Sequence, residues 1–138
     1  MTAVLNPYLN FTGQAREAMN FYQSVFGGEV SAMTFEQVNP NDEKIDPVDA
    51  NKIMHSQLET PAGFTLMASD VPQAMQPMPN GGISLSGDSA DELRGYWEKL
   101  TDHAQVLVPL SKQAWGDEFG MLIDKFGVNW LMNISGPR

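Results

Sequence analysis

The chain has 138 residues, 42% of them hydrophobic, which is enough for a single domain with a sizeable core. Seventeen acidic and eight basic side chains give a formal net charge of −9, which argues against a nucleic-acid partner because nucleic-acid binding needs a basic surface. The lack of cysteine excludes a disulfide framework, a thiolate metal site and a cysteine nucleophile. No stretch approaches the roughly 20 apolar residues of a membrane span and residues 1–9 lack a leader pattern, so we expect a soluble, cytoplasmic protein without a membrane partner.

The first half of the chain predicts a strand, a helix and three further strands. Residues 4–11 read as the first strand, with Pro7 inside it at an edge or bulge. A helix follows from Gln14, capped by Thr12 and ended by Gly27 and Gly28. Its apolar residues recur at helical spacing: Ala15, Ala18, Met19, Tyr22, Val25 and Phe26. The three strands are expected over residues 29–38, 52–60 and 64–69.

Two loops interrupt this pattern. Residues 39–51 hold two prolines and most of the local acids, which predicts a long exposed loop and a candidate lid. Residues 71–80 hold three prolines and read as an irregular linker. Asp70 and Asp117 are interpreted as turn residues.

After the linker the order of elements begins again. We expect a strand over residues 83–87, a helix opened by a capping box of Ser89 and Glu92, a strand over residues 105–110, and a final hairpin. In the hairpin turn, Asp124 can accept a backbone N–H and Gly127 can adopt the positive φ. One constant offset places Ala15 on Ala90 and Glu17 on Glu92. The sequence therefore predicts an α+β fold of two βαβββ modules forming a cup-like, eight-stranded mixed sheet, with the helices on its outer face.

The order of several short motifs resembles that of a known family. The motifs are Pro7-Tyr8-Leu9-Asn10-Phe11, then Phe21-Tyr22 and Phe26-Gly27-Gly28, the segment Met67-Ala68-Ser69-Asp70, Trp115-Gly116, and Asp124-Lys125-Phe126-Gly127-Val128. Their order and spacing resemble the PhnB-like branch of the vicinal oxygen chelate superfamily, which includes glyoxalases and bleomycin-resistance proteins. The resemblance covers residues 1–138 as one domain, with modules of about 1–70 and 81–138, and implies a homodimer.

The resemblance also implies where an enzyme of this superfamily would hold its metal. The four positions that face the cup fall at Pro7, Met67, Gly82 and Leu131, within one residue of strand slip. None of these side chains is a good ligand for a divalent metal. We therefore expect no metal and no cofactor. PhnB-like sequences often carry a demethylubiquinone methyltransferase label, but this chain shows no glycine-rich strand-to-helix turn to seat a methyl donor.

Three candidate site residues lie on one expected strand, and two others, Met67 and Trp115, lie elsewhere in the chain. His55, Gln57 and Glu59 share a strand face, where His55 and Glu59 could act as general acid or base or help hold a metal. A hydrogen-bonded polar face is the alternative interpretation. Met67 could contribute an adaptable lining, and Trp115 could stack on a flat ligand or pack in a core or dimer. His103, near a helix end, is interpreted as a surface cap.

Three hypotheses about function follow from these residues. The first is a metal-free protein that binds an unknown small molecule through His55, Gln57, Met67 and Trp115. The second is an enzyme of the same superfamily with an atypical site around His55 and Glu59. The third is a dimeric scaffold without a ligand. Neither the ligand nor the reaction can be named from the sequence.

Overall fold

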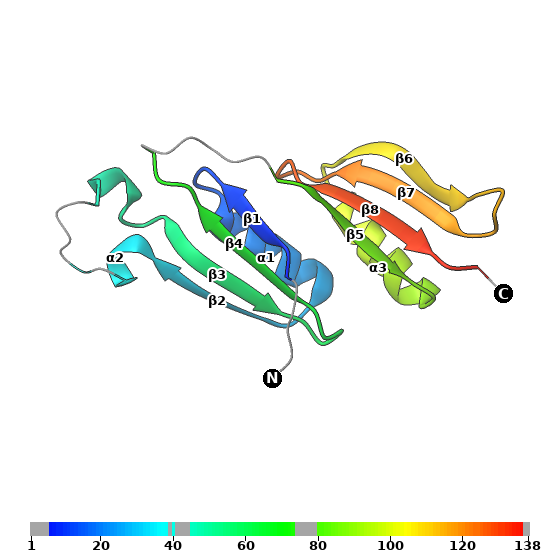
Figure 1. Cartoon of the computed structure of the whole chain (residues 1–138), viewed down its shortest axis with the longest axis horizontal. Helices are drawn as coiled ribbons and strands as arrows, with labels where there is room; N and C mark the ends of the chain where they lie inside the picture. Colours follow the sequence, from blue (N-terminus) through cyan, green and yellow to red (C-terminus); the bar gives the residue numbers. More distant parts are fainter. Residues whose placement is uncertain (1–5, 39, 41–44, 74–79, 137–138) are drawn as a thin grey trace. The chain divides into compact units, whose positions relative to one another are not determined.

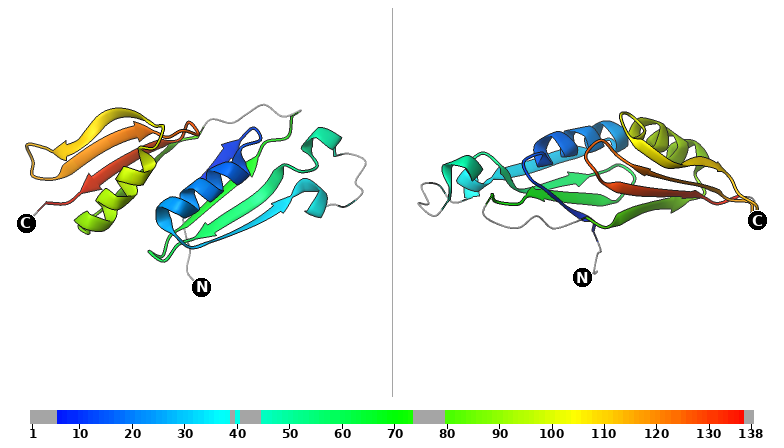
Figure 2. Two further views of the ribbon diagram at one scale, coloured as in Figure 1. Left: turned by 180° about the vertical axis from the view of Figure 1, so that it is seen from behind. Right: turned by 90° about the horizontal axis from the view of Figure 1, so that it is seen from above.

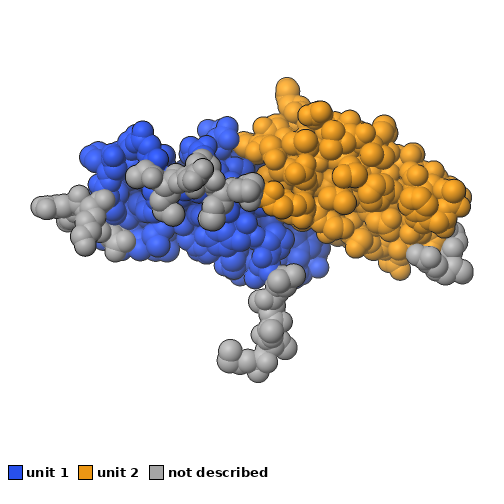
Figure 3. All heavy atoms as spheres, turned by 45° about the horizontal axis from the view of Figure 1, so that its top comes forward, with its two compact units in different colours: residues 1–79 blue, residues 80–138 orange. Residues whose placement is uncertain are grey.

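The computed structural model describes residues 6–38, 40, 45–73 and 80–136 (Figure 1). The chain divides into two compact units, residues 1–79 and 80–138, which Figure 3 distinguishes by colour. The first unit contains, in order, β1 (Tyr8–Phe11), α1 (Ala15–Phe26), β2 (Glu29–Thr34), α2 (Phe35–Val38), the 3-10 helix η1 (Pro47–Asp49), β3 (Ile53–Glu59) and β4 (Thr65–Asp70). The second contains β5 (Gly82–Gly87), α3 (Ala90–Leu100), β6 (Gln105–Lys112), β7 (Glu118–Ile123) and β8 (Asn129–Ile134).

The first unit is a four-stranded mixed sheet covered on one face by α1. Its strand order is β1-β4-β3-β2, with β1 parallel to β4 and the other pairs antiparallel. Figure 2 shows α1 lying across one face of this sheet. All six residues of the expected apolar stripe of α1 are buried, which confirms that face of the helix. They pack against alternate residues of the strands: Leu9, Phe11, Leu58, Leu66 and Ala68 are also buried.

The second unit repeats this plan with the strand order β5-β8-β7-β6. Strand β5 runs parallel to β8, and the other pairs are antiparallel. The core between α3 and the sheet is built on Leu93, Met132 and Ile134. The final hairpin is confirmed: Asp124 accepts hydrogen bonds from the N–H groups of Phe126 and Val128, and Gly127 has φ +84°. The fold class, α+β with two βαβββ modules, is confirmed, and the eight strands of the described residues form two four-stranded sheets.

Two of the expected strands differ from the structure. The strand expected over residues 29–38 stops at Thr34, and α2 follows as a single turn. Thr34 and Gln37 cap each other, since the Thr34 N–H donates to Gln37 Oε1 and the Gln37 N–H donates to Thr34 Oγ1. This is a capping box, a helix-start signal that outweighs the strand alternation here. The first strand is shorter than expected because β1 begins at Tyr8, after Pro7; residues 4 and 5 lie outside the described part of the chain.

The N-terminus of α1 is capped from a distant strand rather than by Thr12. Gln14 occupies the N-cap position without a side-chain capping bond. Instead, Asp70 Oδ1 accepts from the N–H groups of Gly13 at 2.8 Å and Ala15 at 3.0 Å. Asp70 Oδ2 accepts from the N–H of Ile53 at 2.9 Å. Asp70 is the last residue of β4, and its side chain links this strand to β3 and to the start of α1. This corrects its interpretation as a turn residue.

Helix α3 and the 3-10 helix η1 begin with different caps. Ser89 is the N-cap residue of α3 as expected, but its side chain makes no capping bond to the backbone. In the loop expected over residues 39–51, Asp46 caps η1 by accepting from the Val48 N–H, while residues 39 and 41–44 lie outside the described part. Within the described residues, no helix is both long and apolar enough to cross a membrane.

Candidate functional site

The first sheet has one face turned away from α1, which we call the helix-free face. It is defined by Tyr8, Ser31, Met33, His55, Gln57, Glu59 and Met67. These residues alternate with the buried ones along their strands, for instance Ser56 and Leu58 on β3 and Leu66 and Ala68 on β4. The register sets Met33 opposite His55, and places Met67 between Gln57 and Tyr8. The structure thus brings three of the four proposed binding residues, His55, Gln57 and Met67, onto one surface.

A β-bulge shapes this surface beside His55. The register of β2 against β3 shifts at this point, so that Met33 faces His55 while Thr34 faces Ile53. The extra residue in β3 is Met54, which is 37% exposed. Because a bulge inverts the alternation, Ile53 enters the core although it lies two residues from His55. The bulge therefore returns Ile53 to the core and leaves Met54 exposed next to His55.

Tyr8 is the closest polar partner of His55. Tyr8 Oη lies 3.4 Å from His55 Nδ1, and the two ring centroids are 6.0 Å apart with an interplanar angle of 34°. This distance is long for a hydrogen bond between a hydroxyl and a ring nitrogen. Both groups therefore keep hydrogen-bonding capacity for a third molecule. Sequence reasoning missed Tyr8, because the contact joins residues 47 positions apart through the parallel pairing of β1 and β4.

His55 and Glu59 do not form a pair. They lie four residues apart on one strand, which is about 13 Å along the backbone. Between them, Gln57 Nε2 donates to Glu59 Oε1 at 2.9 Å. The helix-free face thus has two separate polar contacts, one between Tyr8 and His55 and the other between Gln57 and Glu59.

The ion pairs of the described residues lie away from this face. Lys52 Nζ is 2.9 Å from Asp49 Oδ1, and its hydrogen bond, with that of the Gln73 N–H, holds the pKa of the Asp49 carboxyl below its usual value. In the second unit the hydrogen bond from Lys125 lowers the pKa of Asp102. Burial and a hydrogen bond to Glu92 raise the pKa of Tyr96 to about 12. These charges stabilise the two units and leave the helix-free face largely neutral.

The four expected metal positions carry no set of metal-binding side chains. Pro7 lies outside β1, with its carbonyl accepting from the Met67 N–H, and Tyr8 takes the position opposite Met67. In the second sheet, a Cβ at Gly82 would lie 3.2 Å from Leu131 Cδ1. Across the described residues, no group of three or more His, Cys, Asp or Glu side chains is placed to hold a metal ion. A thioether, a phenol and an aliphatic side chain do not fit the hard or borderline divalent metals.

Trp115 and His103 lie in the second unit. Trp115 is 63% exposed on the loop between β6 and β7, next to Gly116, which has φ +101°. His103 follows α3 with φ +55°, and its Nδ1 lies 2.8 Å from Asp102 Oδ1. That neighbour suits a surface role at a helix end. Both residues belong to the second unit and His55 to the first, so the contribution of Trp115 to a pocket with His55 stays a prediction.

Three pockets in the described residues are lined by other side chains. One of about 340 Å³ lies between α1 and β2 in the first unit. A second of about 340 Å³ lies beside the start of α3, with Arg94, Lys112 and Glu118 in its lining. A third of about 290 Å³ includes Asp70 and Lys52 near the start of α1. None of the three is predictable from the sequence, because each depends on how far a helix covers its sheet.

Comparison with known proteins identifies the family and the fold. A family model described as 3-demethylubiquinone-9 3-methyltransferase matches residues 3–133. Protein PA1353 from Pseudomonas aeruginosa is 34% identical and superposes with a TM-score of 0.81, over 97% of this chain and 98% of that one. A PhnB protein from Bacillus cereus is 25% identical with a TM-score of 0.69, over 96% and 100% of the two chains. A member of the glyoxalase/bleomycin resistance protein/dioxygenase superfamily from Sphaerobacter thermophilus shares the fold at 18% identity and a TM-score of 0.58, over 98% of each chain.

Proposed function

Because this chain belongs to the 3-demethylubiquinone-9 3-methyltransferase family, a PhnB-like branch of the glyoxalase/bleomycin resistance superfamily, we propose that it binds a small molecule on its helix-free face without a metal. The pair formed by Tyr8 and His55 carries this proposal. Two hydrogen-bonding groups 3.4 Å apart stand on a surface that also presents thioether side chains. Small-molecule sites typically combine a mainly apolar lining with a few such converging polar groups.

The exposure of apolar side chains supports the same proposal. Tyr8 is 45% exposed and Met33 is 48% exposed, although the other face of the same sheet is packed against α1. Flexible thioethers adapt to the shape of a bound molecule, and covering them removes apolar surface from water. We assign Met67 and Gln57 to the lining, since they adjoin Tyr8 and His55 in the register. Trp115 is proposed as a stacking surface, and the homodimer implied by the resemblance is kept as part of this proposal.

The family description names a methyl transfer, which the strand-to-helix turn of the first unit does not favour. A nucleotide-like methyl donor is commonly seated on free N–H groups at such a turn. Here the N–H groups of Gly13 and Ala15 are already bonded to Asp70 Oδ1. We therefore propose binding without proposing methyl transfer.

An enzyme with an atypical site is the second candidate. Its support is that an imidazole beside a phenol can accept and return a proton, with His55 as general base and Tyr8 as its partner. Glu59 would act only through Gln57 in this version, because of its distance from His55 along the strand. Any turnover should then be lost in His55→Ala while the fold is retained, and retained turnover would remove this role.

A thermal-shift screen tests the binding proposal. A ligand present at 100 times its Kd stabilises the folded state by about 2.7 kcal/mol, which is readily measured as a rise in Tm. In a library of small aromatic and polar compounds, we expect hits that stabilise the wild-type protein and lose that effect in His55→Ala and Tyr8→Phe. His103→Ala is the matched control, since it removes the only other histidine, which is exposed on the second unit. Hits that stabilise all four proteins equally would contradict the proposed site.

A further inference from the structure

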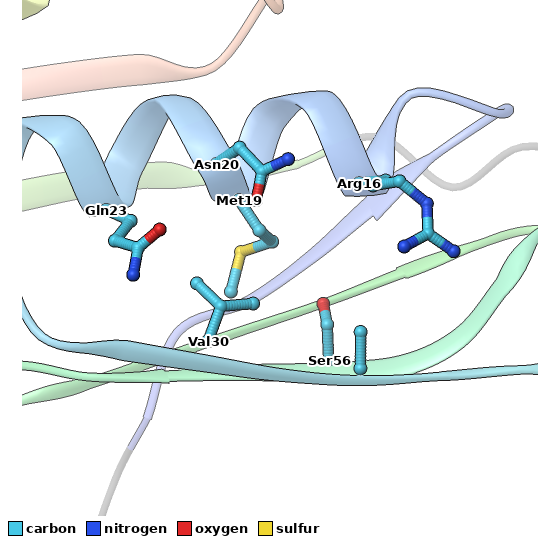
Figure 4. A pocket seen from close by; sticks show the side chains of 7 residues that line it. Arg16, Met19, Asn20, Gln23, Val30 and Ser56 are labelled. Atoms are coloured by element: carbon cyan, nitrogen blue, oxygen red, sulfur yellow. The ribbon is translucent and has the colours of Figure 1, made fainter.

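A separate pocket lies on the other side of the first sheet, between α1 and the edge strand β2. Its volume is about 340 Å³, within the range of small-molecule sites. Seven residues line it: Arg16, Met19, Asn20, Gln23, Val30, Ala32 and Ser56. Figure 4 shows Arg16 and Gln23 toward opposite ends of the helix above the pocket, with Met19 between them and Val30 and Ser56 rising from the sheet.

The pocket exists because α1 does not cover β2 as it covers the other strands. Met19, on the side of α1 that faces the sheet, is fully buried, and Ser56 on β3 is 1% exposed. On β2, in contrast, Val30 is only half-buried and Ala32 is exposed, although both point toward the helix side of the sheet. The accessible apolar part of the pocket is therefore formed by Val30 and Ala32 on β2, and Met19 is buried next to it.

The rim of the pocket is polar and carries a single charge. Arg16 is the only charged residue among the seven, and the side chains of Arg16 and Asn20 have no hydrogen bond or ion pair among the described residues. They lie four residues apart, on one face of α1. Gln23 uses its Nε2 to donate to the Gly28 carbonyl, and Ser56 Oγ donates to the Ala68 carbonyl at 2.7 Å, so each keeps an oxygen that can accept.

This combination selects the chemistry of a ligand. A guanidinium offers two parallel N–H donors to a carboxylate, and such charge-assisted bonds are stronger than neutral ones. Asn20 adds a neutral donor one helical turn away. One positive charge matches one carboxylate, while the apolar part of the pocket suits a short hydrocarbon group. We propose that the pocket between α1 and β2 is a second binding site, which takes a small organic carboxylate with its acid group on Arg16 and Asn20 and its apolar part against Val30 and Ala32, next to the buried Met19.

Methyl NMR tests this site directly. In protein labelled with ¹³C at the methyl groups of Met, Ala and Val, butyrate and benzoate should produce saturable shifts at Met19, Val30 and Ala32. The uncharged butyramide and benzamide should bind at least about tenfold more weakly, because they lose the charge-assisted bonds. The NMR signals of the Met33 and Met67 methyl groups on the helix-free face should not shift. The two sites are therefore tested separately, and either proposal can fail without the other.

Two arginine variants provide the contrast. Arg16→Gln removes the charge from an exposed helix position, and we expect it to weaken butyrate and benzoate binding by about tenfold or more. Arg94→Gln is the matched control on α3, where the arginine already contacts Glu118; it should leave the affinity unchanged. The proposal would be overturned by carboxylate shifts that persist in Arg16→Gln, by equal binding of the amides, or by the absence of any saturable shift at the three methyl groups.

Discussion

Within each unit, one buried aspartate accepts several hydrogen bonds and so joins neighbouring segments of the chain. Asp70 accepts three backbone N–H groups, two at the start of α1 and one from β3. Asp124 accepts two in the final hairpin and a third bond from Trp130 Nε1 at 2.8 Å. Both side chains are almost fully buried. For Asp124 the partners are within six residues, so the sequence predicts the role; for Asp70 they lie 17 to 57 residues away, and no local pattern reveals them.

The role of Asp70 predicts a large loss of stability. Asp70→Ala leaves buried N–H groups without acceptors and uncaps α1, which should lower the free energy of unfolding by about 2–4 kcal/mol. Asp70→Asn keeps one oxygen but turns an amide donor toward another donor, so its loss should be intermediate. Urea denaturation followed by circular dichroism measures both. Asp91→Ala, at a fully exposed position of α3, should change the value by less than about 0.5 kcal/mol. A loss equally small for Asp70→Ala would contradict the capping role.

At the scale of elements, the sequence predicts the two long helices, α1 and α3, and the final hairpin closely. Their signals are local: a buried stripe on α1, Gly27 at its end with φ +76°, and a turn closed by Asp124 and Gly127. The alternation on β3 also places His55 and Gln57 on one face, as the structure has them. The contact of Tyr8 with His55 could not be predicted, because it depends on the register of a parallel strand pair, which no turn fixes.

The turn from α1 into β2 makes a close approach that a side chain cannot share. Gly28 has φ +96°, and a Cβ there would lie 1.9 Å from the Glu59 carbonyl oxygen. Gly63 has nearly the same φ, +98°, with nothing within 4 Å. We expect Gly63→Ala to cost about 1–2 kcal/mol from backbone strain alone.

Gly28→Ala adds a backbone clash to the same strain and should cost at least about 3 kcal/mol, with the packing of β2 on β3 disturbed. Urea denaturation measures the free energy of unfolding of both variants. The difference between Gly28→Ala and Gly63→Ala gives the cost of the backbone clash, since both share the strain. Equal losses in the two variants would mean that the chain shifts to make room and that the approach to Glu59 is not tight.

At the scale of the whole molecule, the duplicated order of elements is what the sequence predicts best. A constant offset between two weakly similar halves yields two units with the same strand order and the same single parallel pair. The pockets beside the helices are not predicted, because small differences in how far each helix covers its sheet create them. The net negative charge of the chain, and the lack of Lys and Arg among the residues that define the helix-free face, agree with a small-molecule partner rather than nucleic acid.

The metal-dependent chemistry of the superfamily needs a bound ion, whereas we propose that the helix-free face binds its ligand without one. Elemental mass spectrometry of the purified, tag-free protein, with thermal shifts in added divalent ions, tests it most directly. We expect far less than one metal per chain and no rise in Tm, since Tyr8, Met67, Gly82 and Leu131 offer no suitable ligand set. Near-stoichiometric metal that stabilises the fold would contradict the proposed metal-free binding and favour the enzyme with an atypical site at His55.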